Sequence, residues 1–259
     1  MMIDMDVLLG RWPFMPLKYD TVDGVLELMD RADIERGVVT SLNSVFYYDC
    51  EIGNREVGQA CRQHPDRFIP FIVLNPNLML WKQHLQECLE NYNVKGIKLH
   101  PDYHKYSLLE EKTAAIMEEA RKVHLPVYIQ TSLVDMRHHP GYCLVPEVPI
   151  SEVAQAIERY AQNTFIIGGA QHFRARASEL IRTTKRDDFY IVIDGLGGPF
   201  DGLGGFVDRI GSSRLLFGTR TPILYAEAAR MVVEQSPISK EDQDRIFGTN
   251  AAQLLGLAN

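Results

Sequence analysis

The sequence lacks several features that mark whole classes of protein. Its four cysteines (Cys50, Cys61, Cys88 and Cys143) are widely spaced and form no Cys-x-x-Cys pair, which argues for reduced thiols and against a disulfide framework or a zinc knuckle. No apolar run approaches the ~20 residues that a transmembrane helix needs. Asp4 places a charge near the start, where a secretory leader would be apolar. We therefore expect a cytoplasmic protein with no membrane partner.

An excess of basic residues is also absent. Lysine and arginine together number 27 against 34 aspartates and glutamates, which gives a formal net charge of -7. Nucleic acids and anionic membranes select for basic surfaces, so neither is expected as a partner. A small anionic ligand remains compatible, because a local pocket can be positive on an acidic protein. Hydrophobic residues make up 46% of the chain and charged residues 24%, as in globular proteins with a sizeable core.

What the sequence does contain is an alternation that repeats eight times. Its first component is a set of short apolar or β-branched runs, each predicted to be a strand. One of them, Phe68–Leu74, is almost continuously apolar, which is typical of parallel strands buried on both faces. The predicted strands are Met2–Leu9, Gly37–Leu42, Phe68–Leu74, Gly96–His100, Val127–Thr131, Phe165–Gly168, Tyr190–Asp194 and Arg214–Gly218.

The second component is a set of segments with helical periodicity. The first opens on Thr21, a plausible cap, and carries apolar residues at positions 22, 25, 26 and 29. Ser151 is the predicted cap of a later helix. The glycine-rich interval Pro199–Gly211 is a weaker helical pattern, and Glu241–Leu257 predicts a C-terminal helix over the outside of the fold. The remaining predicted helices are Trp81–Tyr92, Leu108–His124, Ser151–Gln162, Ala175–Thr183 and Ala226–Gln235.

This alternation predicts the fold. Strands separated by helical segments form right-handed βαβ units and a parallel sheet. Eight such units in 259 residues favour a closed (β/α)8 TIM barrel over an open doubly wound sheet. No GxGxxG motif follows the first strand, so a dinucleotide-binding sheet has no support. We predict an α/β protein with one TIM-barrel domain over residues 1–259 and a C-terminal helix.

In a TIM barrel the active site lies at the carboxyl ends of the strands. Alternation along a strand places Asp4, Asp6 and Leu8 on one side of the first strand, and Lys98 with His100 on one side of the fourth. The polar residues at or just after the strand ends are Asp4, Asp6, Ser41, Asn43, Asn75, Lys98, His100, Gln130, Gln171, His172, Asp194 and Arg220.

Several of these segments resemble, in order and spacing, those of the amidohydrolase-related metal-dependent hydrolases. The opening run Ile3–Gly10 resembles that family's Ile-Asp-x-His-x-His-x-Gly, and Gly248–Leu257 is close to its terminal Gly-Asn-Ala-x-x-Leu-x-Gly-Leu segment. The resemblance covers nearly the whole chain and implies a TIM barrel. The other matching segments are Gly96–Pro101, Pro126–Thr131, Phe165–Gly169 and Arg214–Pro222.

The departures from that family concern its metal ligands, which are two histidines on strand one, one each on strands five and six, and an aspartate on strand eight. The matching positions here are Asp6, Leu8, Gln130, Gly169 and Arg220. Leucine and glycine offer no ligand atom and arginine is a fixed cation, so we expect no metal cofactor where the family typically holds zinc or another divalent ion. Because strands one and eight are neighbours, we predict an ion pair between Asp6 and Arg220 at the former metal position.

These observations leave three hypotheses about function. In the first, the protein is a hydrolase or lyase that acts without a metal on a small, carboxylated substrate. Its acid–base residues would be Asp6, His100, His172 and Asp194, and its substrate-binding residues would be Lys98, Gln130 and Arg220.

The second hypothesis is a metal enzyme with a rearranged ligand set, and the third is a small-molecule sensor without catalysis. The fold alone does not choose among the three. The rearranged ligands would come from Asp4, Asp6, His100, His172 and Asp194. His138 and His139 are expected to be solvated loop residues, and Gly195–Gly198 a permissive turn. Barrel exteriors of this kind often dimerise, so a homo-oligomer is a further expectation.

Overall fold

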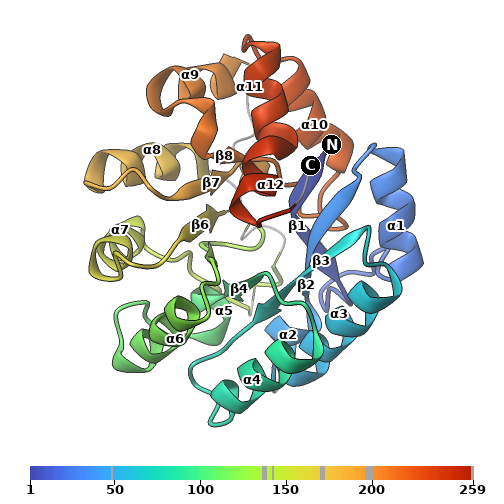
Figure 1. Ribbon diagram of the computed structural model, residues 1–259, viewed down its shortest axis with the longest axis vertical. Helices are drawn as coiled ribbons and strands as arrows, with labels where there is room; N and C mark the ends of the chain where they lie inside the picture. The colour runs from blue at the N-terminus through green and yellow to red at the C-terminus, as the bar shows by residue number, and fades with distance from the viewer. Residues whose placement is uncertain (48, 136–138, 142, 170–172, 196–200, 258–259) are drawn as a thin grey trace.

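The computed structural model describes residues 1–47, 49–135, 139–141, 143–169, 173–195 and 201–257. Eight parallel strands form one sheet in the order β1 to β8, with helices packed around it (Figure 1). The strands are β1 (Ile3–Leu9), β2 (Arg36–Ser41), β3 (Phe68–Val73), β4 (Gly96–Leu99), β5 (Val127–Gln130), β6 (Phe165–Gly168), β7 (Tyr190–Val192) and β8 (Leu215–Leu216).

Backbone hydrogen bonds bring the first strand back to the last. The Met5 amide donates to the Phe217 carbonyl at 2.9 Å, and the Leu8 amide donates to the Thr221 carbonyl at 2.8 Å. Val7 and Thr221 also form a parallel bridge. The predicted (β/α)8 TIM barrel is therefore confirmed, with the β1–β8 seam closed by the segment that follows β8.

The helices follow most of the predicted segments. Thr21 caps α1, because its hydroxyl accepts a hydrogen bond from the Gly24 amide at 3.1 Å. Ser151 is not a cap: α7 begins at Ile150 after Pro149, so Ser151 lies within the first turn. The main helices are α1 (Val22–Arg31), α3 (Glu51–Gln63), α4 (Trp81–Asn91), α6 (Glu111–Lys122), α7 (Ile150–Arg159), α8 (Phe173–Thr183), α9 (Asp201–Ile210) and α10 (Ala226–Glu234).

Two short helices, α2 (Asn43–Phe46) and α5 (Pro101–His104), follow β2 and β4 directly. Helix α3 falls in an interval for which no helix is predicted from the sequence. The glycine-rich interval does form a helix, α9. In the described part of the chain, no helix combines the length and the hydropathy of a bilayer span.

The C-terminal segment differs from the predicted single helix. It consists of α11 (Lys240–Asp244), a π-helical turn over Arg245–Thr249, and α12 (Asn250–Leu254). Ala251, Ala252 and Leu255 belong to the same buried cluster as inward-facing strand residues such as Ile3 and Phe71. The segment therefore plugs the amino end of the barrel instead of lying over its outside.

A register irregularity in β1 decides which of its side chains face inward. Strict alternation would place Asp4 and Asp6 on one side, but the pairing with β2 shifts between Asp4 and Val7. Ile3 and Met5 pack inside the barrel, as does the Asp6 side chain, whereas Val7 packs in the layer between strands and helices. The shift aims Asp6 into the barrel and leaves Asp4 outside the central group.

Candidate active site

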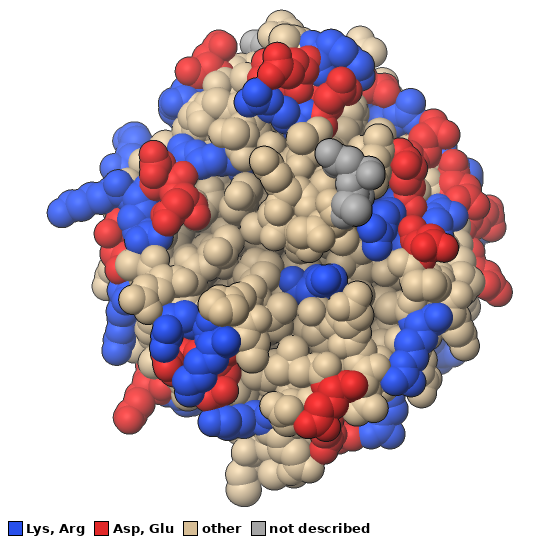
Figure 2. Space-filling model, viewed as in Figure 1, with Lys and Arg blue, Asp and Glu red and all other residues tan. Residues whose placement is uncertain are grey.

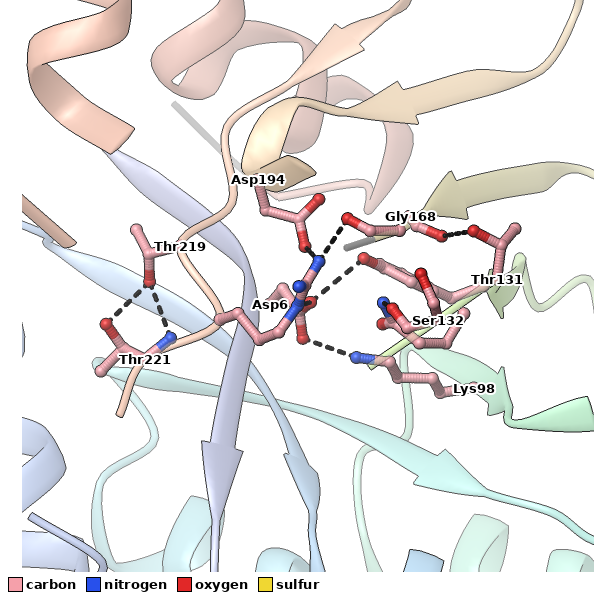
Figure 3. A network of polar contacts seen from close by, with 12 residues as sticks. Asp6, Lys98, Thr131, Ser132, Gly168, Asp194, Thr219 and Thr221 are labelled. Atoms are coloured by element: carbon pink, nitrogen blue, oxygen red, sulfur yellow. Dashed lines mark hydrogen bonds and ion pairs between the residues drawn. The ribbon is translucent and has the colours of Figure 1, made fainter. Parts of the chain in front are cut away.

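Asp6 stands at the centre of a buried polar network near the carboxyl ends of the strands (Figure 3). Its carboxylate lies 2.5 Å from the ammonium nitrogen of Lys98 on β4, and the two side chains are 0% and 2% exposed. The Tyr128 hydroxyl on β5 donates to the other carboxylate oxygen at 3.3 Å. The same oxygen lies 3.6 Å from Nε of Arg220. The predicted Asp6–Arg220 ion pair is therefore present, but Lys98 is the nearer partner.

Arg220 is the second hub of this network. It follows β8 with a φ of 59°, a left-handed conformation that is unusual for a residue with a Cβ and that often occurs at functional sites. Its guanidinium donates to the Asp194 carboxylate and to the Gly169 carbonyl. The side chains of Arg220 and Asp194 are 2% and 0% exposed. Two cations and two carboxylates thus neutralise one another inside the barrel.

The environment shifts the pKa values of Asp6 and Asp194 in opposite directions. Burial alone would raise the pKa of Asp6, but the charges of Lys98 and Arg220 together outweigh it and hold the pKa below its usual value. Burial raises the pKa of Asp194 to about 7, with the negative charge of Asp6 adding to the shift and Arg220 opposing it. Pairs whose pKa values diverge in this way are suited to separate base and acid roles.

His100 and Gln130 complete the group of predicted site residues that the structure brings together. Both are fully buried at the ends of β4 and β5. Burial, together with the charge of Lys98, lowers the pKa of His100 well below its usual value, so the imidazole is neutral. The Gln130 amide nitrogen donates to the Ser132 carbonyl at 2.8 Å.

Several buried polar atoms here have no hydrogen-bond partner among the described residues. They are both ring nitrogens of His100, the amide oxygen of Gln130, one carboxylate oxygen of Asp194 and Nε of Arg220. Buried polar groups in proteins are almost always satisfied, so such a concentration of unmet donors and acceptors marks a place for a ligand or for water. His172, the remaining predicted catalytic residue, lies outside the described residues.

Asp4 has a different role from the one proposed for a metal ligand. Its carboxylate accepts hydrogen bonds from the Thr219 amide at 3.0 Å and the Asp6 amide at 2.9 Å, and from the Thr219 hydroxyl. Burial raises its pKa to about 6. Asp4 therefore joins β1 to the loop after β8 and fixes the backbone on which Asp6 and Arg220 stand.

Apolar and aromatic side chains pack over the inward-facing Leu8. Trp12 contacts Phe46 with ring centroids 5.4 Å apart and Phe14 with centroids 5.2 Å apart. The Tyr103 hydroxyl lies 2.9 Å from Nε2 of His139. His139 is therefore half-buried beside these rings, not solvated as expected, and His138 lies outside the described residues.

This aromatic group, defined as Trp12, Phe14, Phe46, Tyr103 and His139, is not predicted from the sequence. Its members come from four separate segments, namely the loops after β1 and β5 and the helices α2 and α5. Only Trp12 and Phe14, which are close in the sequence, show a local aromatic pattern. Tyr128 was detectable by a simpler route, because alternation along β5 places it on the same face as Gln130.

The described residues do not fit the metal centre that the resemblance to the metal-dependent hydrolases implies. Leu8 packs in an apolar cluster, and the guanidinium of Arg220 sits beside the one carboxylate that the ligand positions retain, that of Asp6. Within the described ranges, no group of three or more histidine, cysteine, aspartate or glutamate side chains is placed to hold an ion. The four charged groups satisfy one another by ion pairing, which is the task a bound cation would perform for ligand carboxylates.

Comparison with known proteins finds one matching family model and several similar folds. A family model described as amidohydrolase matches residues 3–257. The solved structure of 2,6-dihydroxybenzoate decarboxylase from Rhizobium is 18% identical, with a TM-score of 0.76 and 99% coverage of both chains. That of 5-carboxyvanillate decarboxylase from Sphingomonas paucimobilis is 13% identical, with a TM-score of 0.74 and 99% coverage of both chains.

A third solved structure is a dihydroxybenzoic acid decarboxylase from Polaromonas sp. JS666 with bound manganese and the inhibitor 2-nitroresorcinol. It is 16% identical, has a TM-score of 0.73, and aligns over 99% of this chain and 97% of that chain. At these identities the structural likenesses show the fold alone. No curated protein matches the sequence significantly.

Proposed function

The chain belongs to the amidohydrolase family, and on that premise we propose that it is a hydrolase or lyase that acts on a small carboxylated substrate without a metal centre. The observation that carries this proposal is the buried network in which Lys98 and Arg220 hold two carboxylates of opposite pKa shift. Asp6 is ionised and suited to act as a base. Asp194 can carry a proton near neutral pH and is suited to act as an acid.

As a lyase, the site would remove a carboxylate as CO2. Protonated Asp194 gives its proton to the substrate carbon that bears the carboxylate, and the carbon–carboxylate bond then breaks and returns its electron pair to the substrate. Asp194 regains a proton from water, so the balance is one carboxylate and one proton consumed for one CO2 released. The decarboxylases among the similar folds support testing this reaction first. As a hydrolase, Asp6 would take the proton of an attacking water.

Substrate binding follows from the same network. When Asp194 is protonated, the charge of Arg220 is no longer matched by a second carboxylate and becomes available to the substrate carboxylate. The free amide oxygen of Gln130 can accept a hydrogen bond from a substrate hydroxyl. The rings of Trp12 and Phe46 offer an apolar wall to a flat substrate body.

The test is turnover of a panel of small aromatic and aliphatic acids, followed by CO2 release and by loss of substrate, with chelator-treated protein. We expect Asp194→Asn to lower the kcat of CO2 release by about 100-fold or more, because it removes the proton donor, and Asp6→Asn to lower the kcat of hydrolysis likewise, because it removes the ionised base. Asp23→Asn on the exposed face of α1 removes the same charge and serves as the control. Wild-type activity in both Asp194→Asn and Asp6→Asn, or activity that returns only on adding a metal, would refute the proposal.

One observation favours a second candidate, a non-catalytic sensor for a small anion. All four central charges already pair with one another, as in a structural network that only shapes a pocket. A sensor would bind a panel acid with saturation and release no product over many hours. Asp6→Asn and Asp194→Asn would then weaken binding only modestly, whereas in the enzyme one of them lowers turnover by about 100-fold or more while binding persists. The net charge of -7 supports a small molecule over nucleic acid as the partner, in a cytoplasmic setting.

A further inference from the structure

A cavity lies at the opposite end of the barrel from the candidate active site. Its volume is about 430 Å³, within the range of small-molecule sites. It is bordered by the starts of β2 and β3, by the residues before β4, and by the ends of α3 and α4. Phe68, Tyr92 and Leu257 give it apolar walls. We refer to it as the basal cavity.

Three cations line the basal cavity, namely Arg36, Arg62 and Lys95, and no carboxylate of the described residues does. Across the part of the chain that the structure describes, none of the three forms an ion pair with an aspartate or glutamate side chain. Arg67, which borders an adjacent hollow, does pair, with Asp30 at 2.7 Å. Figure 2 shows positive side chains near the middle of the face on which both chain ends are drawn, amid uncharged surface.

The two arginines are held in place by neighbouring groups that leave their charge unbalanced. Arg62 donates to the Asn91 carbonyl at 2.6 Å, and its guanidinium lies 4.9 Å from the centre of the Tyr92 ring. Arg36 donates to the Pro65 carbonyl at 3.5 Å, while its Nε is buried without a partner among the described residues. Arg36 also borders an acidic hollow on its other side, which makes Arg62 and Lys95 the cleaner probes of the cavity.

From this combination we infer that the basal cavity binds a small phosphorylated molecule with an apolar or flat body. Three unpaired cations around one cavity favour a phosphate monoester, which carries close to two negative charges, over a monocarboxylate. Arginine recognises phosphate with paired N–H donors and lysine as a point charge. The apolar walls set this ligand apart from a free inorganic ion, because they would bury the body of the ester.

The experiment titrates the purified full chain with phenyl phosphate by calorimetry, with phenol and inorganic phosphate as comparison ligands. We expect one saturable site for phenyl phosphate, weaker binding of inorganic phosphate and none of phenol. Lys95→Gln and Arg62→Gln should each weaken phenyl phosphate about tenfold, the usual effect of one charge-assisted hydrogen bond. Lys185→Gln removes an equal charge from an exposed lysine that does not line the cavity, and should change binding less than about twofold.

Three results would overturn the inference: no saturable binding of phenyl phosphate, binding unaffected by both cavity variants, or an equal loss in Lys185→Gln. Inorganic phosphate binding as tightly as phenyl phosphate would refute the role of the apolar walls. A crystal structure of the wild-type chain with phenyl phosphate gives a reading that needs no variant. It should place the phosphate within hydrogen-bonding distance of the Lys95 ammonium, and a phosphate found only at the carboxyl end of the barrel contradicts the inference.

Discussion

Replacing Arg220 with methionine removes the cation that joins Asp6 to Asp194 while keeping an apolar side chain of similar length. The guanidinium is almost fully buried, so no solvent takes over its role. Its loss leaves the Gly169 carbonyl without this donor and the Asp194 carboxylate without its positive partner. We expect the variant to fold with a lower free energy of unfolding, by an amount that depends on pH.

The effect has three contributions. One is the lost attraction between Arg220 and Asp6, which stays ionised beside Lys98, so this cost does not vary between pH 6.5 and pH 9. The unmet Gly169 carbonyl costs about 1–3 kcal/mol at any pH. The Asp194 carboxylate adds a cost only when it is ionised. When the pKa of a carboxyl group is raised in the folded protein, the free energy of unfolding falls as the pH rises from the unfolded-state pKa to the folded-state pKa. In wild type that loss ends near pH 7, the pKa of Asp194, whereas in Arg220→Met the pKa is higher and the loss continues.

Urea unfolding at pH 6.5, 8 and 9 measures this difference. The deficit of Arg220→Met should be about 2 kcal/mol at pH 6.5 and grow by about 1.4 kcal/mol per pH unit above pH 7, because one pKa unit corresponds to that energy. Near pH 9 it reaches the about 3–5 kcal/mol typical of a broken buried pair. The double variant Arg220→Met with Asp194→Asn should keep the small deficit and lose the growth. A deficit independent of pH, or growth that persists in the double variant, would show that ionised Asp194 is not the source of the pH dependence.

Two further predictions concern the supports of the site. Asp4→Asn should remove about 3 kcal/mol of the pH dependence of the unfolding free energy between pH 4 and pH 7. The pKa of wild-type Asp4 is raised from 3.8 to about 6, so the folded protein loses stability as this carboxyl ionises. Unfolding curves across that range measure the difference, and parallel curves for the two proteins would contradict it. Gly168→Ala should cost about 1–3 kcal/mol, because its Cβ would meet the Tyr128 hydroxyl at 2.0 Å. The control is Gly205→Ala on the exposed side of α9, where the new methyl group meets open space. This variant should gain up to ~1 kcal/mol in the free energy of unfolding, measured by heat or urea. Equal effects at the two glycines would show that the close approach to Tyr128 does not matter.

The barrel was predictable from the sequence because its signals are local and repeated. Phe68–Val73 is apolar throughout and can only be a strand buried on both faces. Helix α3 was not predicted because Gly53 and Gly58 interrupt its apolar pattern. The structure shows why they are there: a Cβ on Gly58 would meet the Tyr92 ring at 2.4 Å. The close packing of α3 against that ring requires a glycine at position 58, although glycine weakens the helical pattern in the sequence.

The polar residues at the strand ends could be read from the sequence, but their contacts and the aromatic group could not. Strand-end positions identified Asp6, Lys98 and Arg220, and adjacency of the first and last strands predicted the Asp6–Arg220 pair. That Lys98 would be the nearer partner of Asp6 depends on the β1 irregularity, which no local pattern shows. Asp194 lies in a 3-10 turn (Ile193–Gly195) just beyond β7. Its pairing with Arg220 therefore depends on the geometry of a turn, which the alternation of side chains along a strand does not predict.

We propose that Lys98 and Arg220 stand in for the cation that the family typically holds. Calorimetric titration of chelator-treated, tag-free protein with Zn²⁺ and Mn²⁺, with Asp6→Asn titrated in parallel, measures whether the site takes a metal. We expect no saturable one-to-one binding that depends on Asp6, because both central carboxylates already face fixed cations. One equivalent of tightly bound metal in the wild type, lost in Asp6→Asn, would contradict it.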